Sequence, residues 1–167
     1  FLESVREVKK NYPNIDYSEQ LVNAMAARLV RDPENFDVIV TTNMFGDILS
    51  DEASEIAGGL GLASSINYGD QNAMAQAQHG SAPDIAGKNI ANPTALIGSI
   101  ALLFNWLAVK RNDPTLDEAA LEIQNALSTM ISNVEGRTRD LGGNNSTSDF
   151  GCGVVAHLEE QSKKVEL

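Results

Sequence analysis

Apolar positions change between a helical and a strand-like period along this chain, which predicts an α/β fold. Spacings of three and four residues predict helices at residues 1–11, 22–32, 41–56, 93–109 and 114–134, and a last one from residue 146 onward. Alternating or β-branched runs predict strands within residues 12–22, 36–42 and 73–80. The glycine-rich GGLGL at residues 58–62 ends the preceding helix.

The most compact β-branched run, FDVIVTT at residues 36–42, predicts a buried parallel strand. It leads into a helical segment where Asp47, Asp51 and Glu55 recur every four residues, although like charges at this spacing weaken a helix. Ligand groups gather at the carboxyl ends of strands in α/β folds. Asp47 and Asp51 are therefore either oxygen ligands of Mg²⁺ or Mn²⁺ or part of a solvated acidic face, and Glu55 reads as surface.

A second stretch with candidate ligand-binding residues is HGSAPDIAGKNIANP, residues 79–93. It lacks both the G-x-G-x-x-G of a dinucleotide loop and the GK[ST] of a P-loop. Gly80 nevertheless permits close approach of a ligand, Asp84 could accept a hydrogen bond from a ribose, and Asn92 could satisfy an adenine edge or cap the next helix. His79 suits a structural or a catalytic role. The stretch is either a nucleotide-binding loop or a surface loop that caps a helix.

Composition narrows the classes of partner and compartment. The 167 residues are 43% hydrophobic, enough for one core or two small ones, and 12 Lys and Arg against 23 Asp and Glu give a net charge of -11. This charge disfavours nucleic acid and anionic membranes as partners. Cys152 cannot form an internal disulfide, which favours an intracellular location, and the apolar run at residues 95–109 is shorter than a bilayer span.

Two motifs together resemble those of the NAD-dependent β-decarboxylating dehydrogenases, the family of isopropylmalate, isocitrate, homoisocitrate and tartrate dehydrogenases. TTNMFGDILSDEAS resembles the family's metal-binding segment, and HGSAPDIAGKNIANPTA resembles its cofactor loop, in the same order. Residues 1–40 and TRDLGGNNSTSDF also read like family segments. The resemblance covers nearly the whole chain and implies an isocitrate/isopropylmalate dehydrogenase-like α/β fold truncated to its carboxyl-terminal half.

The resemblance also implies roles for individual residues. Asp47 and Asp51 would bind Mg²⁺ or Mn²⁺, and Asn23 stands where the family has a third aspartate, a change that weakens the site because an amide is a neutral ligand. The residues implied around NAD are His79, Gly80, Ser81, Ala82, Asp84 and Ile85, with Asn92 at the adenine. Asp84 followed by Ile85 resembles the NAD-preferring type, because a carboxylate repels a 2′-phosphate. Gln76 stands where many members carry a glutamate near the nicotinamide.

Family subunits have two α/β domains between which the chain crosses. The resemblance implies that this chain is a single truncated unit. Residues 1–70 would correspond to part of the family's dimerisation and metal-binding domain, and residues 71–167 to part of its cofactor-binding domain. Half of such a fold leaves strand edges and apolar faces uncovered, so we expect an intertwined or rearranged homodimer. The apolar Val22, Met25 and Leu29 fit a packed helix near that interface.

The activity implied by the resemblance is oxidative decarboxylation of a 2-hydroxy dicarboxylic acid. The family's substrate-binding arginines and its proton-transferring tyrosine and lysine belong to the half that precedes Phe1, so no catalytic residue is assigned here. Three interpretations stay open: part of a dehydrogenase, a repurposed non-redox lyase, isomerase or cyclase, and a non-catalytic subunit that binds a full-length homologue. Each predicts a small carboxylic acid or protein partner in the cytoplasm or the mitochondrial matrix.

Overall fold

The computed structural model describes residues 1–165, which fall into two compact units that divide between Ala57 and Gly58. The sequence analysis predicts a single unit whose two parts meet after residue 70. The structural boundary is earlier and coincides with Gly58 and Gly59, whose φ angles of 130° and 121° favour glycine and end α3. The assignment of dimerisation and cofactor binding to the two parts stays a prediction.

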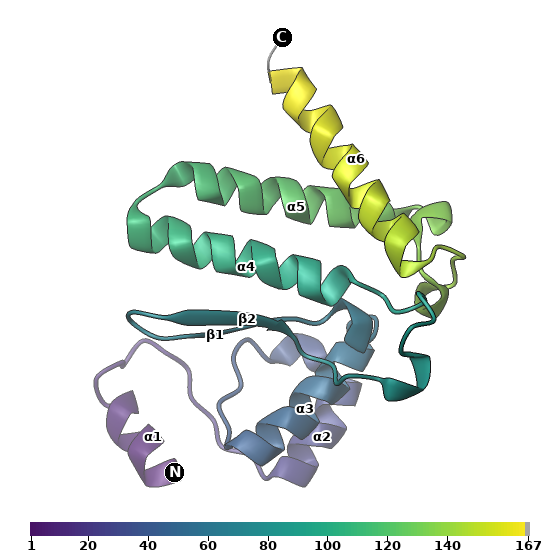
Figure 1. Cartoon of the computed structure of the whole chain (residues 1–167). Coiled ribbons are helices and arrows are strands. Elements are labelled where there is room, and N and C mark those ends of the chain that lie inside the picture. Colours follow the sequence, from purple (N-terminus) through teal and green to yellow (C-terminus); the bar gives the residue numbers. More distant parts are fainter. Residues whose placement is uncertain (166–167) are drawn as a thin grey trace. The chain divides into compact units, whose positions relative to one another are not determined.

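The first unit is helical (Figure 1). It contains α1 (Leu2–Lys9), α2 (Val22–Arg31), the short 3-10 helix η1 (Pro33–Asn35) and α3 (Asn43–Ile56). Helices α2 and α3 pack through Met25, Leu29 and Leu49, which form the buried cluster of this unit. The predicted helices at residues 1–11, 22–32 and 41–56 are confirmed, and α2 ends just before Pro33, which cannot continue the hydrogen-bond ladder.

Two predicted strands in the first unit are wrong. Residues 36–42 form neither a strand nor a buried segment, and the side chains of Val38 and Val40 are 78% and 65% exposed. Residues 12–22 likewise contain no strand. A strand exists only with a hydrogen-bonded neighbour, and the described residues of this unit supply none. The β-branched run therefore has strand composition without a partner for pairing.

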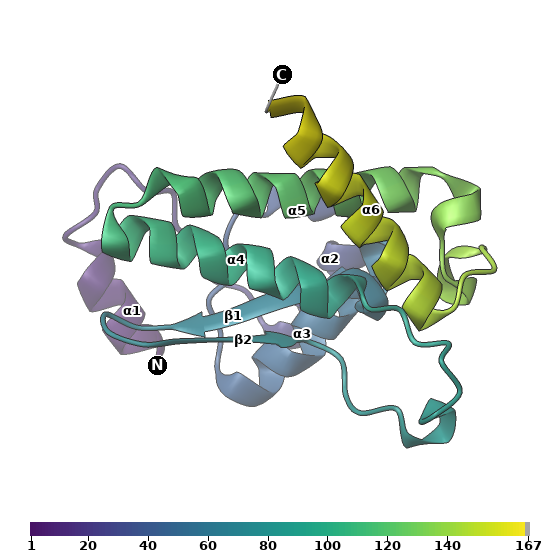
Figure 2. The same ribbon diagram turned by 45° about the horizontal axis from the view of Figure 1, so that its top comes forward.

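The second unit combines a β-hairpin with three long helices. The elements are η2 (Leu60–Leu62), β1 (Ser64–Tyr68), β2 (Ala73–Ala77), η3 (Pro83–Ile85), α4 (Thr94–Arg111), α5 (Pro114–Ser132), η4 (Val134–Gly136), η5 (Arg139–Leu141) and α6 (Thr147–Val165). Figures 1 and 2 show α4 between the hairpin and α5. Strands β1 and β2 are antiparallel, with Ile66 opposite Ala75. The predicted strand at residues 73–80 is confirmed, whereas the sequence analysis missed β1.

Small residues on α4 let the hairpin approach the helix closely. A Cβ at Gly98 would meet the Ser64 hydroxyl, so a larger residue would require the Ser64 side chain to rotate. The fully buried Ser99 hydroxyl accepts a hydrogen bond from the Ser65 amide at 3.0 Å and lies 2.8 Å from the Gln76 carbonyl oxygen, to which it can donate. Ser99 therefore ties both strands to α4, and with them the chain that leaves β2.

Helix α4 extends beyond the apolar run at residues 95–109 at both ends. It runs for 18 residues, from Thr94 to Arg111, and by length and composition alone it could cross a membrane. One third of the helix is buried within the chain, and it packs against α5, β1 and β2. These contacts are typical of the central helix of a folded domain.

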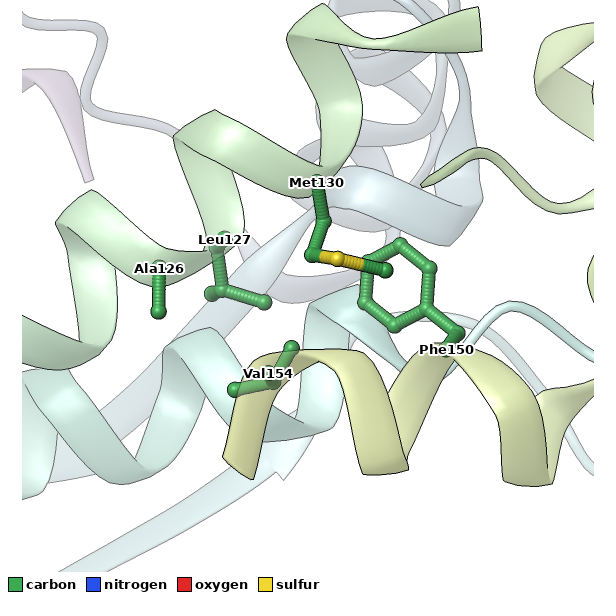
Figure 3. Packing of buried hydrophobic residues seen from close by; sticks show 5 residues of the cluster. All are labelled: Ala126, Leu127, Met130, Phe150 and Val154. Atoms are coloured by element: carbon green, nitrogen blue, oxygen red, sulfur yellow. The ribbon is translucent and has the colours of Figure 1, made fainter. Parts of the chain in front are cut away.

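The main hydrophobic core of the second unit lies between α5 and α6 (Figure 3). Its buried residues are Ala126, Leu127, Met130, Phe150 and Val154. Figure 3 shows the Met130 side chain extending toward the Phe150 ring, an arrangement in which the thioether adds favourable contact. A Cβ at Gly153 would meet the end of the Met130 side chain, which would have to move within the core.

Candidate functional site

Helix α3 places Asp47 and Asp51 on one exposed face. Leu49 is 5% exposed and packs toward α2. Because successive helical residues are rotated by about 100°, the two aspartates lie roughly 40° apart and each about 160° from Leu49. Both carboxylates are exposed and point away from α2. This arrangement allows both to contact one ligand on that face.

Asn23 does not join the two aspartates within one chain. It is exposed near the start of α2, whereas α2 contacts α3 through Met25 and Leu29 on the side of α3 that carries Leu49. In the described part of the chain, no three His, Cys, Asp or Glu side chains are grouped so that they could hold a metal ion. Asn23 and the two aspartates therefore lie on exposed faces of different helices.

The candidate cofactor loop, residues 79–93, connects β2 with α4. His79, Gly80, Ser81, Ala82 and Asp84 are exposed, and Ile85 is half-buried. The loop also has strained backbone, because Ala82 has φ 41° and ψ 62° immediately before Pro83. A left-handed residue other than glycine costs about 1–2 kcal/mol, and a following proline favours extended backbone instead. Such strain is found at ligand-binding sites when surrounding structure maintains it.

Two ends of the loop region differ in their contacts. The His79 ring nitrogen Nδ1 lies 2.9 Å from the carbonyl oxygen of Gly80, so this nitrogen carries the proton if it donates there. Gln76, expected near the nicotinamide, lies on the exposed side of β2. His79 and Gln76 therefore border open surface, in contrast to the buried Asn92.

Asn92 is 9% exposed, and both polar atoms of its side-chain amide form hydrogen bonds within the chain. Its Oδ1 accepts a hydrogen bond from the Thr94 amide at 3.0 Å, and its Nδ2 donates to Asp140 at 2.8 Å. The other Asp140 oxygen accepts from the buried Thr138 hydroxyl at 2.6 Å. The side chain thus accepts from the first amide of α4, but the N-cap is Pro93, one residue later than predicted. These bonds use one proton of Nδ2 and one lone pair of Oδ1, and each atom keeps a second hydrogen-bonding position.

Asp140 was missed by the sequence analysis. It lies on η5, and its hydrogen bond to Asn92 spans 48 residues of sequence. The local signal, a threonine two residues before an aspartate, predicts a turn but does not indicate its partner. Asp140 fixes the orientation of the Asn92 amide, so it belongs to the candidate site.

Residues 1–154 match the isocitrate/isopropylmalate dehydrogenase family. Homoisocitrate dehydrogenase of Methanocaldococcus jannaschii is 48% identical over 163 residues, which is 98% of this chain and 44% of that protein. The 3-isopropylmalate dehydrogenase of Sulfurisphaera tokodaii is 47% identical over 150 residues, which is 90% of this chain and 44% of that protein. The matches therefore include enzymes named for different substrates.

The fold agrees with these sequence matches. The crystal structure of isocitrate dehydrogenase from Methylococcus capsulatus superimposes with a TM-score of 0.87 at 40% identity, covering 94% of this chain and 45% of that one. This chain spans less than half the length of these relatives. Its truncated α/β fold is the one expected from the two motifs, and the chain belongs to the isocitrate/isopropylmalate dehydrogenase family.

Proposed function

We propose that this chain supplies the NAD-binding and metal-binding part of an oxidative decarboxylase that acts on 2-hydroxy dicarboxylic acids. The observation that carries the proposal is the exposed loop at residues 79–93, anchored through Asn92 and Asp140, in a chain of this family. The loop exposes polar side chains and backbone groups, and its carboxyl-terminal end is held by the hydrogen bond between Asn92 and Asp140. NAD bound there would accept the hydride removed from the hydroxylated carbon.

The loop residues have separable tasks. Asn92 is assigned to the adenine edge, while Asp84 accepts a hydrogen bond from the ribose and disfavours a 2′-phosphate. The exposed backbone around Gly80 and Ser81 allows close approach of the dinucleotide, because no atom lies within 4 Å of the place where a Cβ on Gly80 would stand. These residues would bind and orient the cofactor and take no part in bond making or breaking.

Asp47 and Asp51 fit a divalent ion, because both carboxylates occupy one exposed face of α3. Two carboxylates suffice for Mg²⁺ or Mn²⁺ when water and substrate oxygens complete the coordination. The ion would act as a Lewis acid toward a substrate oxygen that gains negative charge. The two aspartates hold and orient the ion.

A second copy of the chain would complete this site. Asn23 and the two aspartates diverge within one chain, and the exposed Met44 and Ile48 lie beside the aspartates on α3. Their side chains are 62% and 56% exposed, an apolar surface of the kind that mediates association. The proposal is a homodimer in which Asn23 of the partner subunit approaches Asp47 and Asp51.

The substrate and the complete reaction need groups that these residues do not supply. Binding of substrate carboxylates and proton transfer are assigned to no residue of this chain, so a small 2-hydroxy carboxylic acid is proposed as a class only. The non-redox and non-catalytic interpretations remain the alternatives, since Asn23 weakens the ion site. Copurification with a full-length homologue would favour the second of these. An intracellular compartment is proposed for each case.

Calorimetric titration with NAD and NADP tests the cofactor assignment. We expect the chain to bind NAD more tightly, and Asp84→Asn to reduce the preference about fivefold, because two unit charges about 4 Å apart in water repel by roughly 1 kcal/mol. Asp70→Asn makes the same charge change in the exposed turn between β1 and β2 and should leave the preference unchanged. Absence of NAD binding by the unmutated chain would refute the proposed function.

A further inference from the structure

The candidate cofactor loop is joined to the first turn of α6 by four hydrogen bonds, which we call the Asn89 latch. Asn89 Oδ1 accepts from the Ser148 amide at 3.1 Å and from the Ser148 hydroxyl at 3.0 Å. The Asn89 carbonyl accepts from the Thr147 amide at 3.1 Å, and the Ala91 carbonyl accepts from the Thr147 hydroxyl at 2.6 Å. The latch therefore connects two segments that lie 56 to 59 residues apart in sequence.

Asn89 combines a backbone conformation with a hydrogen-bond acceptor. Its φ of 54° lies in the left-handed region, which asparagine adopts more readily than most residues. Glycine would reproduce this backbone but would lack the side-chain oxygen that Ser148 uses. The conformation and the acceptor can therefore be separated by substitution.

The latch provides hydrogen-bond acceptors for the first backbone amides of α6. Ser146 and Asp149 form a capping pair, with the Asp149 amide donating to the Ser146 hydroxyl at 3.1 Å. The amides of Thr147 and Ser148, the other early donors of the helix, are both used by Asn89. A residue distant in sequence thus performs part of the capping of α6.

The latch lies between the parts of the loop that are assigned to the cofactor. Asp84 precedes Asn89 and Asn92 follows it, with Asn92 held separately by Asp140. Figure 2 shows the loop leaving β2, passing through η3 and returning beside the start of α6 to reach α4. The exposed part of the loop is therefore fixed at its returning end by two independent sets of hydrogen bonds.

We propose that Asn89 is a positioning residue for dinucleotide binding, an inference that rests on the proposed function. Asn89 would act through α6, without itself contacting the cofactor, by restricting the loop to the conformation that binds. Preorganisation of this kind raises affinity because less conformational freedom is lost on binding. A loop without the latch would bind the same ligand more weakly.

Three variants and one control test the proposal by calorimetric titration with NAD. Asn89→Gly keeps the backbone conformation and removes the acceptor, Asn89→Asp keeps both, and Ser148→Ala removes the hydroxyl donor alone. Asn112→Gly is the matched control, because Asn112 also has a left-handed backbone, φ 52°, but ends α4. We expect Asn89→Gly to raise the Kd about fivefold, the factor for one net hydrogen bond.

Further outcomes separate positioning from a general structural role. We expect Ser148→Ala to have a smaller effect than Asn89→Gly, and Asn112→Gly to leave the affinity unchanged. Asn89→Asp should keep the Ser148 amide protected from exchange, although its added charge repels the dinucleotide phosphates. Hydrogen exchange of the Ser148 amide should accelerate in Asn89→Gly and not in Asn112→Gly. If the unmutated chain binds NAD and Asn89→Gly binds it equally well, this inference is wrong and the proposed function survives. If the unmutated chain does not bind NAD, the proposed function fails and the inference fails with it.

Discussion

The two compact units differ in how completely each covers its own apolar residues. Among the described residues, the first unit buries three hydrophobic side chains, those of Met25, Leu29 and Leu49, whereas the second buries nine. The first unit also leaves Val38 and Val40 mostly exposed. The second unit closes a core and anchors a loop, while the first presents an exposed acidic and apolar face on α3.

This difference has a consequence for the two candidate sites. The cofactor loop is held by contacts inside the second unit, through Asn89 and Asn92. The acidic face of α3 has its proposed third ligand, Asn23, on a different side of the first unit. We therefore expect NAD binding to be a property of one chain and metal binding to depend on association.

The largest expected effect comes from opening the core of the second unit. Phe150 is fully buried between α5 and α6, so Phe150→Ala should lower the free energy of unfolding by about 3–5 kcal/mol. Urea unfolding followed by fluorescence of Trp106, the single tryptophan, measures this change within the same unit. Val155→Ala on α6 is the control, because Val155 is 53% exposed and its truncation should change stability by less than about 0.5 kcal/mol.

A smaller effect is expected from detaching the hairpin from α4. Ser99→Ala removes the acceptor of the Ser65 amide and a hydroxyl proton that the carbonyl oxygens of Gln76 and Ala95 share, so it should cost about 1–3 kcal/mol. The same Trp106 measurement applies. Ser128→Ala, at an exposed position of α5, should have almost no effect. Equal stability of the two variants would show that Ser99 does not hold the hairpin.

The smallest effect is expected in the first unit and depends on pH. Arg6 donates to both Glu19 oxygens, at 2.6 and 2.5 Å, and Tyr17 donates to one of them at 2.7 Å. These hydrogen bonds, that from Arg6 first, lower the pKa of Glu19 from 4.5 to about 2. The folded state thus favours the ionised carboxylate.

A lowered pKa fixes the sign of the pH dependence. The contribution of Glu19 is present above its ordinary pKa of 4.5 and is lost as the pH falls toward 2. NMR signals of the Tyr17 ring should therefore change over this range, and Glu19→Gln should remove the change. An unaltered Tyr17 titration in Glu19→Gln would mean that another group is responsible.

Local signals were sufficient to predict the helices. The apolar spacing of α2, the Pro33 that follows it, and the Ser146 and Asp149 capping pair all act within one or two helical turns. The glycine pair after α3 likewise has a local effect on the backbone. Elements set by neighbouring residues could thus be predicted from sequence.

Features that depend on distant residues could not be predicted in the same way. Residues 36–42 have strand composition, yet pairing requires a neighbouring strand that the described residues of the first unit do not contain. Strand β1 was missed because its serines read as loop, although Ser65 is fixed by Ser99 on α4. The role of Asp140 follows from a contact across 48 residues. Such pairings leave no local pattern in the sequence.

Manganese binding measured at increasing chain concentration tests the difference between the units most directly. Mn²⁺ affinity, followed by electron paramagnetic resonance, should rise with chain concentration in parallel with dimer formation in sedimentation experiments, and Asp51→Asn should abolish the rise. NAD affinity measured in the same samples should stay constant. An Mn²⁺ affinity that is independent of chain concentration, or no Mn²⁺ binding by the dimer, would contradict a metal site completed by a second copy.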